Sequence, residues 1–116
     1  MALSTRALVV ATIIGTVLQL AMIVGGHYDT LVASFFAVGG MGFSLIAGVI
    51  YGWNAHPTTP AGAATGGLLA GAICALIGIL ASHLWGDVPA SLLVLGTLSS
   101  AVTGAVGGWV GHFFGR

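Results

Sequence analysis

Only four side chains in this sequence carry a full charge at neutral pH, namely Arg6, Asp29, Asp87 and Arg116. They make up 3% of the chain, whereas 58% of the residues are hydrophobic. A soluble domain carries about 25% charged residues, so this chain has too few to cover a surface that faces water. The sequence therefore predicts an integral membrane protein, and its net charge of zero gives no basic patch for nucleic acid.

The apolar residues fall into four long runs, at about 5–25, 31–53, 61–84 and 90–113. About 20 apolar residues are needed for a helix to cross the hydrocarbon core of a bilayer. The runs are too long for strands and show no alternation, and helices satisfy their own backbone in lipid. We therefore expect an all-α integral membrane protein with four transmembrane helices in an up-down-up-down bundle.

The first run could be mistaken for a signal peptide. It is longer than the usual apolar core of about 7–15 residues in such peptides, and no clear Ala-x-Ala cleavage site follows it. We therefore expect the run to stay in the protein as the first span.

The charged residues predict the orientation of the spans. Arg6 and Arg116 fall on one side of the predicted bundle, together with the polar stretch 54–60. Asp29 and Asp87 fall on the other side, where we expect them to be solvated loop residues. Because positive charges favour the cytoplasmic side, both termini are predicted to be cytoplasmic.

Large aromatic residues mark the ends of the predicted spans. Trp and Tyr are enriched where a helix leaves the hydrocarbon for the headgroup region. This position predicts that they are interfacial anchors. The residues are Tyr28, Trp53, Trp85 and Trp109.

The two halves of the chain resemble each other at an offset of 56 residues, which is typical of an internal repeat. The repeat predicts one membrane domain, 1–116, made of two helical hairpins, about 1–56 and about 57–116. Each hairpin has two spans, so the copies would be parallel and related by an axis along the membrane normal. The matched residues are Gly40, Ser44, Gly48, Gly52, Trp53 and His56, which recur as Gly96, Ser100, Gly104, Gly108, Trp109 and His112.

The repeated glycines and serines are spaced by four and so share one helix face. Such faces let membrane helices approach closely, which predicts helix packing through Gly40, Ser44, Gly48, Gly52 and their copies Gly96, Ser100, Gly104, Gly108. Further small-residue faces occur in the third and fourth spans, at 62–66, 67–75 and 107–115. We expect one of these faces to stay free for a neighbouring chain; the alternative is that all of them pack internally.

Few polar side chains lie at membrane depth. No Asp or Glu falls inside a span, which weighs against a proton-driven carrier. Gln19 is the main strongly polar side chain there, and its counterpart in the repeat is Ala75. We expect Gln19 to hydrogen-bond across helices rather than to bind a substrate.

The histidines form two pairs under the repeat. His27 and His83 would lie at one depth, and His56 and His112 at another. Such pairs are candidate ligands for two haems or two metal ions, and His is also the usual pH-sensing side chain. All four lie at span ends, so we expect interfacial anchoring and no cofactor, with haem or metal as the alternative.

These observations predict a function that is not enzymatic. We expect a small multi-pass membrane protein that assembles through its glycine faces, as a homo-oligomer or as an accessory subunit of a larger membrane complex. Its partners would be the lipid bilayer and either itself or other membrane subunits. A small oligomeric channel or facilitator is the second hypothesis. An electron-transfer subunit that binds haem or metal through its paired histidines is the third.

Overall fold

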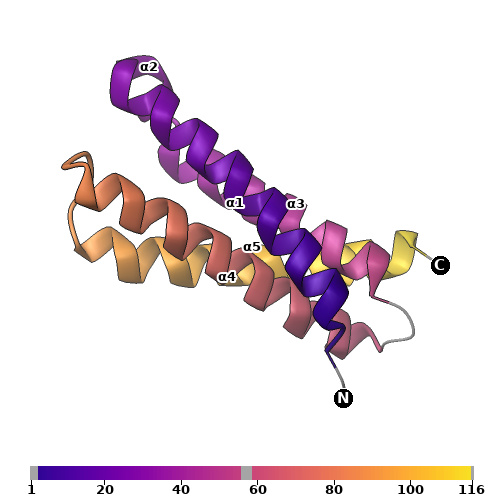
Figure 1. Ribbon diagram of the computed structural model, residues 1–116. Coiled ribbons are helices and arrows are strands. Elements are labelled where there is room, and N and C mark those ends of the chain that lie inside the picture. Colours follow the sequence, from indigo (N-terminus) through magenta and orange to yellow (C-terminus); the bar gives the residue numbers. More distant parts are fainter. Residues whose placement is uncertain (1–2, 56–58, 116) are drawn as a thin grey trace.

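The computed structural model describes residues 3–55 and 59–115, which form helices joined by short connections. Three of these helices, α1, α4 and α5, are long and apolar enough to cross a membrane. The prediction of an all-helical chain with helices long and apolar enough to cross a membrane is therefore confirmed, for three helices of the described residues. In chain order (Figure 1) the helices are α1 (Thr5–Tyr28), α2 (Thr30–Ala33), α3 (Phe36–Asn54), α4 (Pro60–Leu84) and α5 (Ser91–Phe114).

The first residues of α1 and α4 explain why these helices begin where they do. The hydroxyl of Ser4 accepts a hydrogen bond from the N–H of Ala7 at 3.2 Å, and that of Thr59 accepts one from Gly62 at 3.0 Å. These caps satisfy backbone donors that have no partner inside the helix. Pro60 opens α4, where its missing N–H costs nothing.

The second long helix begins later than the sequence predicted. α1 continues to Tyr28, and the carboxylate of Asp29 then accepts a hydrogen bond from the N–H of Leu31 at 2.8 Å. This cap starts the single turn of α2, and a further turn precedes α3, which begins at Phe36 instead of near 31. The 19 residues of α3 extend about 28 Å.

The long helices pack side by side in a narrow body that measures 42 × 21 × 19 Å. Helix α5 packs against both α3 and α4, and α1 lies on α3 and α4. The start of α1 and the end of α5 lie at one end of this body, and α2 lies at the other (Figure 1). The length of 42 Å is close to the thickness of a bilayer with its headgroups, about 40–45 Å.

The bounds of the helices repeat closely at an offset of 56 residues, whereas the contacts between the helices do not. Moving the bounds of α1 by 56 positions gives 61–84, and α4 spans Pro60–Leu84. The same shift turns Phe36–Asn54 into 92–110, which lies inside α5. However, α4 and α5 are in contact over much more of their length than α1 and α3. The two hairpins are thus similar in extent and different in how tightly they close.

The core contains mostly Ala and Gly, and its largest fully buried side chain is Tyr51. The Tyr51 hydroxyl accepts a hydrogen bond from the N–H of Ser4 at 3.1 Å. Its ring occupies the space that a Cβ on Gly66 would need. A single aromatic residue of α3 thereby fixes the start of α1 and lies directly on α4.

Candidate functional site

Of the predicted packing glycines, Gly48, Gly52, Gly104 and Gly108 lie where α5 meets α3 and α4. A Cβ on Gly48 would overlap the carbonyl oxygen of Gly104, and one on Gly52 would overlap that of Gly108. A Cβ on Gly67 would overlap the Gly104 carbonyl oxygen from the α4 side. Backbones this close leave no room for a side chain, so the glycines set the separation of the three helices.

The additional small-residue faces are also occupied. Gly107 and Gly111 of α5 face the carbonyl oxygens of Leu45 and Val49 in α3, and a Cβ on either glycine would overlap those atoms. Within the described residues, each small-residue face identified in the sequence meets another helix of the same chain. The expectation that one face stays free is therefore wrong, because α5 is packed between α3 and α4 and uses two of its faces at once.

Gln19 of α1 is almost completely buried, with 2% of its surface exposed. Its Nε2 donates to the carbonyl oxygen of Gly40 at 3.0 Å and to the Ser44 hydroxyl at 3.3 Å, both in α3. A longer contact of 3.8 Å joins Nε2 to the Cys74 sulfur of α4. The side chain therefore makes the interhelical hydrogen bonds that the sequence led us to expect.

Gly40 and Ser44 are placed differently from Gly48 and Gly52. The Ser44 hydroxyl donates to the carbonyl oxygen of Gly71 at 3.3 Å, which continues the network from α1 through α3 to α4. Gly40 contacts the side chains of Gln19 and Met22. One end of the predicted α3 face thus meets polar α1 atoms, and the other end meets α5.

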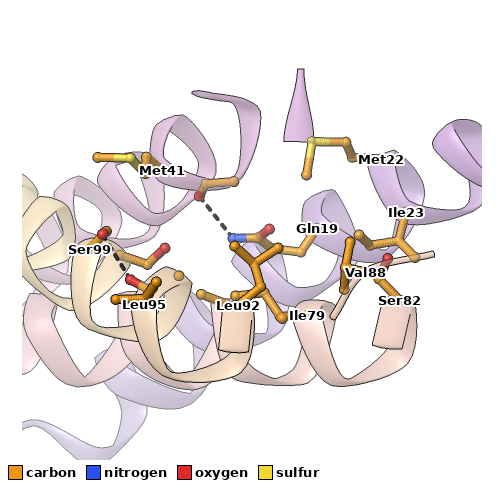
Figure 2. A pocket seen from close by; sticks show the side chains of 14 residues that line it. Gln19, Met22, Ile23, Met41, Ile79, Ser82, Val88, Leu92, Leu95 and Ser99 are labelled. Carbon is orange, nitrogen blue, oxygen red and sulfur yellow. Dashed lines mark hydrogen bonds between the residues drawn. The ribbon is translucent and has the colours of Figure 1, made fainter. Parts of the chain in front are cut away.

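A cavity of about 140 Å³ lies beside this network, between all four long helices. It occupies the part of the molecule nearer α2, where Figure 1 shows the α1–α3 pair diverging from α4 and α5. Gln19 lies nine residues before the end of α1, about 13 Å along the helix. Figure 2 shows the side chains around the cavity, and most are hydrocarbon or thioether groups, including those of Met22, Ile23, Met41, Ile79, Leu92 and Leu95.

Gln19, Ser82, Ser99 and Ser100 are the hydrogen-bonding side chains at the cavity wall. The Ser99 hydroxyl donates to the Leu95 carbonyl oxygen at 2.8 Å. Ser82 is 1% exposed, and its buried hydroxyl has no hydrogen-bond partner among the described residues. Such a group costs free energy unless something satisfies it.

Sequence reasoning identified Gln19 and missed both Ser82 and the cavity. Ser82 lies one turn after Gly78, which packs against the Gln19 side chain, and Ala75 lies on the same wall of the cavity. The available signal for Ser82 in the sequence was a face of small residues in α4, Ala75 and Gly78, which continues to the Ser82 hydroxyl. The cavity itself depends on how far the helix pairs diverge.

The described histidines lie at opposite ends of the molecule. His27 Nδ1 lies 2.8 Å from Asp87 Oδ2, and its ring stacks on Trp85 with centroids 3.6 Å apart. His83 Nδ1 donates to the carbonyl oxygen of Val88 at 2.9 Å, in the same connection between α4 and α5. His112 is buried at the far end of α5, and its predicted counterpart His56 lies outside the described residues.

These contacts place both His27 and His83 against the short connection between α4 and α5. Among the described residues, no three His, Cys, Asp or Glu side chains gather in a group that could hold a metal ion. The two loop acids also differ from each other, because Asp29 caps α2 and Asp87 pairs with His27.

The four predicted interfacial anchors are exposed and fall at two levels. Tyr28 and Trp85 lie near the α2 end, with ring centroids 5.9 Å apart. Trp53 lies at the opposite end, where its backbone contacts Gly115, and Trp109 is exposed on the last turns of α5.

The arrangement as a whole offers a mostly apolar cavity lined by three buried polar side chains, Gln19, Ser82 and Ser100, in a chain with helices long and apolar enough to cross a membrane. No protein family model, curated protein or solved structure matches this chain.

Proposed function

We propose that the chain crosses the bilayer four times, as an up-down-up-down bundle of two tandem hairpins with both termini in the cytoplasm. The length of α3, about 28 Å, supports a fourth span because the hydrocarbon core is about 30 Å thick. The connections at 29–35 and 85–90 carry both acidic residues and would lie on the outer side. Arg6 would lie on the cytoplasmic side, as the positive-inside rule requires.

We propose that this bundle is a non-enzymatic binding protein that takes a small molecule into the cavity between its helices. The observation that carries this function is the 140 Å³ cavity with the buried Gln19 amide in its wall. Mostly apolar pockets with a few converging polar groups are the usual form of small-molecule sites. Polar residues inside a membrane span are costly and tend to mark functional sites.

The chemistry of the cavity wall supports binding rather than catalysis. Its lining side chains are hydrocarbon, thioether, amide and hydroxyl groups. General acid–base catalysis needs a group that gains or loses a proton near the working pH, and amides and alcohols do not. If the bound molecule also crosses the bilayer through the protein, the chain would be a small facilitator. Flux of neutral solutes into proteoliposomes would test this alternative.

Binding can be tested with the methionine methyl groups as reporters. Met22 and Met41 both line the cavity, so their methyl NMR signals in lipid nanodiscs should shift and saturate when benzene is added as a general apolar probe. Ala75→Leu should remove the response, because the larger side chain fills the cavity. Ala21→Leu, on an exposed position of α1, is the matched control and should keep it. Unchanged methyl signals in the wild type would contradict the proposal.

We keep assembly with a second copy or with another membrane subunit as a second proposal. Since the glycine faces are occupied, such a contact would use the large aliphatic side chains that the helices expose, including Ile13, Val17, Leu98 and Val102. Native mass spectrometry of gently extracted protein should then show a multiple of the chain mass or an additional polypeptide. A chain that runs alone in all gentle extractions would oppose assembly.

The haem or metal hypothesis is tested separately from both. A visible absorption spectrum and elemental analysis of the purified protein would detect either cofactor. A coloured or metal-containing preparation would direct attention to His27, His83, His56 and His112.

A further inference from the structure

The hydrogen bonds of Gln19 determine which way its amide faces. The carbonyl oxygen of Gly40 can only accept, so the amide group 3.0 Å from it must be the nitrogen. The Oε1 atom consequently lies on the other side of the amide, as Figure 2 shows. Among the described residues, no group donates a hydrogen bond to this oxygen. This acceptor therefore has no donor among the described residues, and its side chain lines the cavity.

Ser82 supplies a second polar group without a partner in the wall of the same cavity. Gln19 packs its Cβ against Gly78, and Ser82 follows Gly78 by one helical turn, a rise of about 6 Å. The Ser82 hydroxyl can donate one hydrogen bond and accept others, and it makes none with the described residues.

The rest of the cavity suits a hydrocarbon. A cavity of about 150 Å³ lined by aliphatic and aromatic side chains stays dry and binds benzene, and the volume here is about 140 Å³. Water at the polar end would satisfy Gln19 and Ser82 but would leave the apolar part unfilled. A molecule with both an apolar body and one polar end satisfies both parts of the wall.

We propose that the cavity recognises a small uncharged alcohol or phenol of about seven heavy atoms, an inference that rests on the binding function proposed above. The ligand hydroxyl donates its proton to Gln19 Oε1 and accepts a hydrogen bond from the Ser82 hydroxyl. Its ring or short chain lies among Met22, Met41 and Ile79. Gln19 and Ser82 are the residues that distinguish this ligand from a plain hydrocarbon.

A charged ligand does not suit this site. The wall provides no opposite charge, and burying an unpaired ion costs far more than burying a hydroxyl. The nearest acidic group in the chain order, Asp87, already pairs with His27. A lipid acyl chain could fill the apolar part but has no donor for Gln19.

The test compares phenol with benzene, using the methyl signals of Met22 and Met41 in nanodiscs. Probe concentrations are expressed per bilayer volume, with protein-free nanodiscs giving the partition of each probe. In the wild type, phenol should bind about tenfold more tightly than benzene, because two added hydrogen bonds outweigh the cost of desolvating the ligand hydroxyl.

Ser82→Ala should reduce the preference for phenol over benzene by about threefold or more, while benzene binding persists. The substitution removes a hydroxyl that has no partner, so the variant should fold as well as the wild type. Thr12→Val is the control, because Thr12 also has a buried hydroxyl without a partner in the described chain but does not line the cavity. It should leave the preference unchanged.

The outcomes separate the two proposals. Equal binding of phenol and benzene in the wild type, or a preference that survives Ser82→Ala, would overturn the hydroxyl recognition and leave the binding function standing. Methyl signals that respond to neither probe, as expected for a cavity filled by a lipid chain, would overturn both.

Discussion

Gly67 of α4 and Gly104 of α5 exclude side chains from each other: a Cβ on either residue would overlap the carbonyl oxygen of the other. A Cβ on Gly48 of α3 would overlap the same Gly104 oxygen. Three helices therefore meet at one glycine, and lipid-embedded helices gain their packing from such close approach.

Gly104→Ala should destabilise the folded chain by about 2 kcal/mol or more, since overpacking a tight contact forces the backbones apart. Unfolding in mixed micelles of increasing denaturing detergent would measure the loss. The matched control is Gly42→Ala in α3, where a Cβ would meet nothing within 4 Å. This control should be neutral or slightly stabilising, because Ala favours helix more than Gly. Equal effects of the two substitutions would contradict the packing role.

The double substitution Gly48→Leu with Gly104→Leu should disrupt the fold of the single chain rather than only its assembly with a neighbour. Two leucines at a contact between backbones leave α5 no position against α3, so the folded monomer should be lost. Size-exclusion chromatography with circular dichroism would distinguish loss of the folded monomer from loss of assembly alone. A well-folded monomer that only fails to oligomerise would oppose this interpretation.

Gln19→Leu should lower the free energy of unfolding by about 1–2 kcal/mol, because the Gly40 carbonyl and the Ser44 hydroxyl each lose a donor. Unfolding in mixed micelles of increasing denaturing detergent can measure this loss of stability. Ser99→Ala is the control: the Ser99 hydroxyl is exposed and bonds to a carbonyl one turn back in its own helix. Its removal should change stability by no more than about 0.5 kcal/mol.

The contact between His27 and Asp87 should give a coupling energy of about 0.5–1 kcal/mol in a double-mutant cycle. His27→Ala, Asp87→Ala and the double variant form the cycle, with stability as the readout. The ion pair exists only with a protonated imidazole, and both side chains are 26% exposed, so added salt should weaken the coupling. Zero coupling at low salt would show that the contact contributes nothing.

The proposed topology predicts which residues react with a membrane-impermeant thiol reagent in intact cells. Cys74 is buried and can be replaced by Ala to give a background without cysteine. Asp29→Cys and Gly86→Cys should then react from outside, whereas Thr59→Cys should react only after the membrane is opened. If position 29 and position 86 lie on opposite sides, α3 does not cross the membrane and the four-span arrangement is wrong.

The sequence by itself determined that the chain forms long helices apolar enough to cross a membrane, and it determined the extents of α1, α4 and α5 to within a few residues. Runs of about 20 apolar residues leave few alternatives in lipid, and Pro60, Ser4 and Thr59 mark helix starts by local chemistry alone. The late start of α3 was missed because the cap from Asp29 to Leu31 favours a separate turn that hydropathy does not reveal.

Only the tertiary structure decided which faces meet. These helices are apolar nearly all round, so hydrophobic periodicity does not indicate the inner side, as it does in a soluble protein. Spacing predicted that Gly104 lies on a packing face, but its simultaneous contact with Gly48 and Gly67 depends on the position of α5 between two helices. The cavity beside Gln19 and Ser82 likewise arises from the divergence of helix pairs, which no single segment encodes.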